Sequence, residues 1–216
     1  MSDMRQMTGT GRRIENSSFD IVDREAWPHD HGPREWQVVR RVIHATADFE
    51  FKHLTRFSED ALDSGIAAIQ RGAPMYVDVK MIRVGTNARR LAHFGIDVHC
   101  FVSDEDVIAK AKAADSTRSI EGVRKAWDQG LIDGAIVAVG NAPTALLELI
   151  RLVREEGAKP ALVVGMPVGF VNAAESKEEL LSAGIPYIIT RGRKGGSTIV
   201  VATLHALLSM AAEDFR

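Results

Sequence analysis

One histidine of the chain stands where it could move a proton to or from a ligand. His44 lies in the segment 33–48, whose apolar residues recur at the spacing of one helix face: Trp36, Val39, Ile43 and Ala47. At the margin of this stripe an imidazole is partly buried and still reaches a ligand. Asp48, four residues further on, could orient the ring. The pattern offers His44 as a general acid or base, and a purely structural role for it stays open.

The other histidines and the cysteine form no pattern of a metal site. His29 and His31 lie in a segment rich in Pro, Gly and Asp, but spacing places no further ligand with them. His205 lies in an apolar helical segment and His99 beside Cys100, positions typical of structural residues. A single cysteine excludes an intramolecular disulfide and a cysteine-based zinc site. We therefore expect no bound metal.

Three glycine-rich segments that follow apolar runs are candidates for binding an anion. Residues 140–144 follow AIVAV, residues 165–170 follow ALVV, and residues 191–198 follow YIIT. Where strands end and helices begin, free backbone N–H groups and the helix dipole favour a phosphate or a carboxylate. Ordinary turn formation explains many of the same glycines. Neither a Walker A sequence nor a G-x-G-x-x-G after the first strand is present, so no nucleotide cofactor is indicated.

Charge is nearly balanced over the whole chain but not along it. Lys and Arg number 27 and Asp and Glu 29, a formal net charge of −2, which argues against a broad nucleic-acid-binding face. Residues 80–93 and 190–199 nevertheless hold basic side chains and no acidic one. Such runs are typical of solvated helix faces, and they would equally suit a pocket for a small polyanion.

The elements that must position these residues follow an alternating order from about residue 74 onward. Short β-branched or apolar runs predict strands at 75–79, 97–102, 135–139, 161–165 and 187–190. Helical patterns fall at 33–48, 58–71, 104–114, 118–129, 142–156, 173–183 and 196–211. Strands that alternate with helices predict a single three-layer α/β domain with a mainly parallel sheet flanked by helices.

Length and composition fit one such domain. The 216 residues are 45% hydrophobic, and no run approaches the ~18 apolar residues of a membrane helix. The first residues lack the apolar stretch of a secretory signal. We predict a disordered leader at 1–12, an α/β domain at 13–216, and a cytoplasmic protein that binds neither membrane nor nucleic acid.

Seven motifs, in order along the chain, resemble the precorrin-8X methylmutase (precorrin isomerase) family of cobalamin biosynthesis. They are IENSSFDIV at 14–22, RVIHATADFE at 41–50, DVKMIRVG at 78–85, STRS at 116–119, VAVGNAPTAL at 137–146, GMPVGFVNAAESKEEL at 165–180 and RGRKGGST at 191–198. The resemblance extends over about residues 14–211, nearly the whole chain. The Thr86–Asn87 pair after Gly85 departs from the family pattern.

The resemblance implies an isomerase that moves a methyl group from C-11 to C-12 of precorrin-8X, giving hydrogenobyrinate, or of cobalt-precorrin-8, giving cobyrinate. By motif match, His44 takes the place of the family's catalytic histidine, and substrate contacts fall on Ser18, Thr117, Arg118 and Asn141. A sigmatropic shift requires no redox partner, so no cofactor is expected.

The family also implies a homodimer with its site near the subunit interface, acting on a corrinoid polycarboxylate. The alternatives to an isomerase are a non-catalytic corrinoid carrier of the same pathway and, from the glycine-rich segments alone, a phosphate- or nucleotide-binding enzyme.

Overall fold

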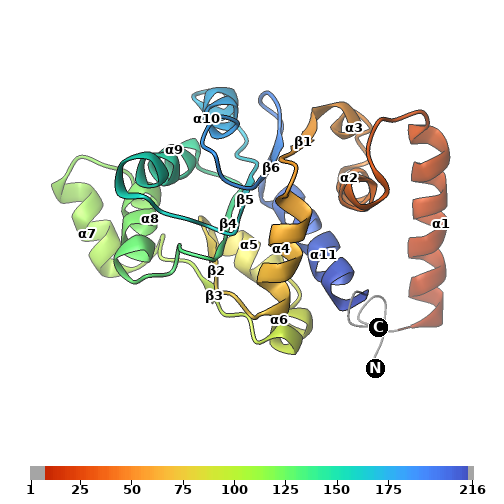
Figure 1. Ribbon diagram of the computed structural model, residues 1–216, viewed down its shortest axis with the longest axis horizontal. Coiled ribbons are helices and arrows are strands. Elements are labelled where there is room, and N and C mark those ends of the chain that lie inside the picture. The colour runs from red at the N-terminus through yellow and green to blue at the C-terminus, as the bar shows by residue number, and fades with distance from the viewer. Residues whose placement is uncertain (1–7, 214–216) are drawn as a thin grey trace.

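A six-stranded sheet with helices on both faces forms the protein, as the computed structural model of residues 8–213 shows (Figure 1). The strand order is β1-β6-β5-β4-β2-β3, and every pairing is parallel except that of β1 with β6. The predicted α/β class with a mainly parallel sheet is confirmed.

The central strands are apolar on both alternations because helices cover both of their faces. They are β2 (Met75–Val77), β4 (Ile136–Val139), β5 (Leu162–Gly165) and β6 (Tyr187–Thr190). The strands expected at 75–79 and 97–102 are shorter than predicted, since β2 ends before Asp78 and β3 comprises only Val98–His99.

Two hydrophobic clusters fill the layers on either side of the sheet. The first contains buried side chains of α2 (Pro33–Thr46), α4 (Ala61–Gln70) and α11 (Ser197–Glu213). The second contains those of α8 (Arg118–Asp128), α9 (Pro143–Arg151) and the short π-helix η1 (Leu152–Glu156) that continues α9. Helix α7 (Glu105–Ala113) packs on α8, and Leu180 of α10 (Ala173–Leu180) joins the second cluster. Figure 1 shows α1 and α2 at one end of the molecule and α7 and α8 at the other.

Five elements were not expected from the sequence. They are α1 (Gly9–Ala26), α3 (Phe51–Leu54), β1 (Thr55–Phe57), α5 (Lys80–Gly85) and α6 (Ala88–Phe94). Helix α1 begins inside the segment expected to be a leader, with the Thr8 hydroxyl accepting a hydrogen bond from the N–H of Gly11 at 3.0 Å. The rest of that segment, residues 1–7, lies outside the described residues.

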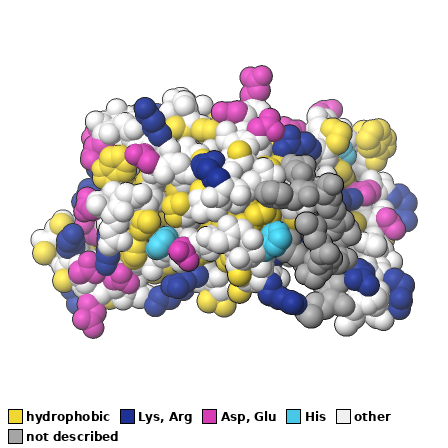
Figure 2. Space-filling view, turned by 60° about the horizontal axis from the view of Figure 1, so that its bottom comes forward, with side chains coloured by type: hydrophobic (Ala, Val, Ile, Leu, Met, Phe, Trp, Pro, Cys, Tyr) yellow, Lys and Arg dark blue, Asp and Glu magenta, His cyan; other side chains and the backbone are white. Residues whose placement is uncertain are grey.

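The surface carries no element suited to spanning a bilayer: among the residues the structure describes, none of the helices is both long and apolar enough. Figure 2 shows acidic and basic side chains interspersed over one face of the molecule.

Candidate functional site

The packing of α1 against α2 brings Ser18 and His44 together. Ser18 Oγ lies 2.7 Å from His44 Nδ1, a hydrogen bond between residues that are 26 positions apart in the chain. Phe19 flanks the imidazole, with ring centroids 5.1 Å apart. Two of the predicted site residues are therefore direct neighbours.

Polar contacts between the two helices fix this arrangement. The carboxylate of Asp23 accepts hydrogen bonds from Trp36 Nε1 at 2.7 Å and from Arg40 Nη1 at 3.0 Å. Arg41 Nη2 donates to Glu15 at 3.3 Å. These contacts set the rotation of α1 about its own axis, and so they direct Ser18 toward α2.

A pocket of about 520 Å³ opens between α1, α2 and the turn that follows α2. Its lining is mainly apolar, with Ser18 and His44 among a few polar groups; the apolar side chains are Ile14, Ile21, Val22, Ile43, Ala47 and Phe49. His44 is exposed. An exposed imidazole in a largely apolar pocket can meet the ring system of a ligand and still exchange a proton.

The Ser18–His44 hydrogen bond leaves one ring nitrogen for a ligand. Within residues 8–213, Nδ1 has Ser18 as its partner and Nε2 has none. The partner of Nδ1 fixes the ring orientation and selects the tautomer. No carboxylate lies behind the imidazole in the described part of the chain, so the pair lacks the third member of a hydrolytic triad.

Asp48 does not orient His44, contrary to the expectation from its spacing. Helix α2 ends at Thr46 because Ala47 takes a left-handed conformation with φ of 53°. The chain turns there, and Asp48 Oδ2 accepts a hydrogen bond from Lys194 Nζ at 2.5 Å. That hydrogen bond lowers the pKa of the Asp48 carboxyl group.

A buried lysine fixes the backbone of the glycine-rich segment that carries Lys194. Lys177 is fully buried, and its Nζ donates to the carbonyl of Lys194 at 2.9 Å. Thr190 Oγ1 donates to the same carbonyl at 2.8 Å. Burial lowers the pKa of Lys177 to about 8. The segment therefore has a fixed backbone from which Lys194 reaches the turn after α2.

Thr117 and Arg118 lie at the beginning of α8, in the opposite layer from His44. The Thr117 hydroxyl caps the helix by accepting from the N–H of Ile120 at 3.2 Å, and it lies 3.3 Å from the hydroxyl of Thr144 on α9. Arg118 is exposed and borders a second pocket of about 600 Å³. One chain therefore does not place these two residues beside Ser18 and His44.

Asn141 stands at a junction whose backbone N–H groups are already occupied. Those of Gly140, Asn141 and Ala142 donate to the carboxylate of Asp78 at 3.0, 2.9 and 2.8 Å. An open anion site on this backbone, expected from the glycine-rich sequence, is therefore wrong. The side chain of Asn141 is exposed and is the part of the residue that can meet a ligand.

Asp78 is the residue at this junction that sequence reasoning missed. Its side chain is buried, and burial raises the pKa of its carboxyl group, while the backbone hydrogen bonds oppose that shift. An acidic residue directly after a buried strand was the available signal. Its partners come from the β4–α9 junction, 62 or more residues later in the chain, and only the strand order reveals them.

Three cations of the basic segments are paired within the chain. Lys194 contacts Asp48 and Glu50, and Arg191 contacts Glu178 at 3.4 Å. Arg90 is buried and donates to the carbonyl of His205 at 3.1 Å. These contacts favour a structural role over a polyanion pocket for Arg90, Arg191 and Lys194.

The two remaining sequence features have structural roles. His29 stacks on Trp36 with ring centroids 3.8 Å apart, and His31 Nε2 lies 2.7 Å from the carbonyl oxygen of Lys52. Asn87, which departs from the family pattern, caps α6 by accepting from the N–H groups of Arg89 and Arg90. Among residues 8–213, no group of three His, Cys, Asp or Glu side chains could hold a metal ion.

Comparison with known proteins gives matches over nearly the whole chain. The family model described as precorrin-8X methylmutase matches residues 13–210. A cobalt-precorrin-8 methylmutase of Leptospira interrogans is 55% identical over 216 residues, covering 97% of this chain and 98% of its own. A precorrin-8X methylmutase of Sinorhizobium sp. is 40% identical over 199 residues, covering 91% and 93%. The crystal structure of precorrin-8X methylmutase from Thermus thermophilus superimposes with a TM-score of 0.90 at 57% identity, covering 94% of this chain and 98% of that one.

Proposed function

The chain belongs to the precorrin-8X methylmutase family, and from this premise we propose which of its residues carry out the reaction. It is an isomerase, an intramolecular transferase that catalyses the methyl shift of cobalamin biosynthesis. A non-catalytic carrier is not favoured. The proposal assigns the proton transfer of this reaction to His44, and the observation that carries it is the 2.7 Å hydrogen bond between Ser18 Oγ and His44 Nδ1 in the apolar pocket.

His44 acts as a general acid and then as a base. The methyl group moves from C-11 to C-12 by a sigmatropic shift within the conjugated ring, and this requires the tautomer that permits migration. His44 donates a proton from Nε2 to the macrocycle and recovers one after the shift, so no proton is gained or lost. Ser18 holds Nδ1 and thereby keeps Nε2 directed to the ligand.

Arg118 binds carboxylate groups of the substrate, together with Thr117 and the side chain of Asn141. The corrinoid carries several acetate and propionate groups, and a guanidinium group pairs well with a carboxylate. These three residues are exposed at the ends of α8 and α9, as a binding role requires.

A second copy of the chain completes the site. Arg118 and His44 lie on helices of opposite layers, so a substrate that meets both must lie between two subunits. Exposed apolar side chains supply a surface for this homodimer: Met81 and Val84 on α5, and Phe170 and Val171 after β5, are between 67% and 84% exposed. The homodimer acts in the cytoplasm.

The substrate is a precorrin-8 macrocycle, with or without cobalt. Relatives named for the cobalt-bearing ring include the proteins of Leptospira interrogans and Priestia megaterium, at 55% and 46% identity, so cobalt-precorrin-8 is the first compound to test. Incubation of the purified protein with each precursor separates the two cases by which one is converted.

Replacement of His44 by Ala tests the assignment. We expect single-turnover conversion to slow by ~10²–10⁴-fold, the usual contribution of a general acid or base, while corrinoid binding persists. The absorbance change of the macrocycle measures conversion, and quenching of tryptophan fluorescence measures binding. Conversion at the wild-type rate would overturn the role of His44, and a wild-type protein that binds but never changes the chromophore would be a carrier.

A further inference from the structure

A network of charged side chains joins α8 to α9 at the centre of their interface. Glu148 on α9 is buried, and its carboxylate accepts hydrogen bonds from two arginines. Arg124 of α8 donates through Nε at 2.9 Å, and Arg151 of α9 donates through Nη2 at 2.8 Å and Nε at 3.1 Å. Arg124 also donates to Glu121 on its own helix at 2.9 Å.

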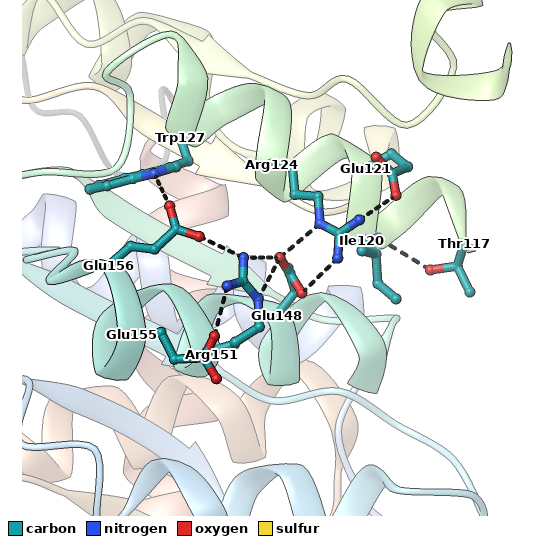
Figure 3. Close-up of polar contacts among 9 residues, drawn as sticks. All are labelled: Thr117, Ile120, Glu121, Arg124, Trp127, Glu148, Arg151, Glu155 and Glu156. Carbon is teal, nitrogen blue, oxygen red and sulfur yellow. Dashed lines mark hydrogen bonds and ion pairs between the residues drawn. The ribbon is translucent and has the colours of Figure 1, made fainter. Parts of the chain in front are cut away.

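The π-helical turn η1 extends the network to the far end of α8. Arg151 Nη2 donates to Glu156, five residues later, at 2.9 Å, because the wider turn brings positions i and i+5 together. The other oxygen of Glu156 accepts from Trp127 Nε1 of α8 at 2.8 Å. Figure 3 shows the contacts running along the interface from Trp127 at one end toward Thr117 at the other.

Apolar packing alone does little to fix the register of α8 against α9. The apolar residues that it buries fully are small, namely Gly122, Val123 and Ala126, and its one large apolar side chain on the core, Trp127, is only partly buried. Small side chains leave a helix free to slide or rotate, since few knobs enter holes on the facing helix. The directional contacts of Glu148 therefore set the register of α8 against α9.

This register decides where Arg118 projects. Arg118 is the first residue of α8, six positions before Arg124, and its neighbour Thr117 contacts Thr144 on α9. We propose that Glu148 is a positioning residue of the substrate site: through Arg124 it fixes α8 so that Arg118 presents its guanidinium group to a carboxylate of the corrinoid. This inference rests on the proposed substrate-binding role of Arg118.

The charge of Glu148 is suited to this role. Burial acts to raise the pKa of its carboxyl group, but the hydrogen bonds from Arg151 and Arg124 outweigh burial and hold the pKa below its usual value. The carboxylate stays ionised at neutral pH, and both arginines remain bound to it. Glu148→Gln keeps the shape of the side chain and removes the charge that holds Arg124.

The test is a KM and kcat comparison of Glu148→Gln, Arg118→Ala and the double variant. Loss of a substrate contact made equally in the ground and transition states raises KM and leaves kcat unchanged. We expect each single variant to raise KM about tenfold, the usual effect of losing a hydrogen bond to a charged group. In the Arg118→Ala background, Glu148→Gln adds no more than about twofold, because its effect passes through Arg118.

Arg154→Ala is the matched control. Arg154 forms an ion pair with Glu179 of α10 and donates to Ser182 at 3.1 Å, so its removal breaks a comparable contact of the same helical segment without touching α8. We expect its KM to equal that of the wild type. If circular dichroism shows that Glu148→Gln is unfolded, Arg124→Gln takes its place, since the Arg124 side chain is 43% exposed.

The outcomes distinguish the positioning role of Glu148 from the substrate-binding role of Arg118. Full additivity of the two substitutions on KM, or a folded Glu148→Gln enzyme with wild-type KM, overturns the positioning role and leaves Arg118 as a substrate ligand. A wild-type KM for Arg118→Ala overturns both.

Discussion

The two halves of the candidate site differ in where their polar groups lie. At the α1–α2 end, the Ser18–His44 hydrogen bond is exposed and stands in a mainly apolar pocket. At the α8–α9 end, Asp78 and Glu148 are buried and fully engaged with backbone N–H groups or arginines. The exposed group is free to exchange a proton, and the buried charges hold helices in place. Substitution of a buried carboxylate should therefore change stability or substrate binding, whereas substitution in the exposed Ser18–His44 pair should change turnover.

The largest expected effect on stability comes from Asp78→Ala. The substitution leaves the backbone N–H groups of Gly140, Asn141 and Ala142 without an acceptor, two of them buried and one partly buried, and we expect the free energy of unfolding to fall by about 3 kcal/mol. Urea denaturation measures it. Asp133→Ala is the control, because exposed Asp133 accepts a single backbone hydrogen bond, from Lys159 at 2.7 Å. Equal losses for the two variants would contradict the contrast between buried and exposed carboxylates.

His205 on α11 is a partly buried histidine in the layer that contains His44. Burial first, and then the charges of Arg90 and Arg41, lower its pKa to about 4, and its Nε2 accepts from the N–H of Asn87 at 3.1 Å. Between pH 6.5 and about 4 the unfolded chain binds the proton more tightly, so stability falls as the pH drops through this window.

We expect this residue to account for a loss of about 3 kcal/mol over that pH range, at 1.36 kcal/mol per pKa unit. In urea denaturation, His205→Gln should remove this loss of unfolding free energy between pH 6.5 and about 4. His93 is an exposed histidine on α6, and His93→Gln should leave the pH dependence unchanged. The same acid sensitivity in His205→Gln as in the wild type would contradict the assignment.

Ser18→Ala tests whether the exposed Ser18–His44 hydrogen bond contributes to turnover. We expect kcat to fall about tenfold, the effect of losing the one hydrogen bond that orients the imidazole, with little change in stability. Ser17→Ala is the control, since Ser17 lines the same pocket without a contact to His44. A Ser18→Ala enzyme as fast as Ser17→Ala would remove Ser18 from the mechanism.

The smallest effect is expected for Lys194→Met. Lys194 is 43% exposed and joins Asp48 and Glu50, and exposed ion pairs contribute little. We expect kcat of the Lys194→Met enzyme to differ from that of the wild type by no more than about twofold. A large loss of kcat would mean that the turn after α2 directs His44 more strongly than its exposure indicates.

The sequence was sufficient for the parts of the fold that depend on local pattern. The runs at 135–139, 161–165 and 187–190 predict buried strands because they are apolar on both faces, and the structure has strands there. Helix α1 escaped prediction because its sequence is polar and two of its large apolar side chains, Ile14 and Ile21, stay exposed. Strand β1 has three residues and exists only through its pairing with β6.

The site was predictable as a set of residues but not as a geometry. The motifs named Ser18 and His44 separately, and the packing of α1 on α2 made them neighbours. The expected Asp48 contact failed because an alanine, not a glycine, takes the left-handed position that ends α2, and alanine gives no such signal. The partners of Asp78 depend on β2 lying beside β4, which is a property of the sheet order and not of neighbouring sequence.

The Asp78 carboxylate can also be regarded as a ligand that the protein has tethered to itself. Because it is covalently attached, its effective concentration at the β4–α9 junction exceeds that of any dissolved anion, and a phosphate or carboxylate from solution does not displace it. Removal of the side chain in Asp78→Ala should therefore leave a site for a small carboxylate from solution. Added formate or acetate should restore the melting temperature of this variant in a saturable way.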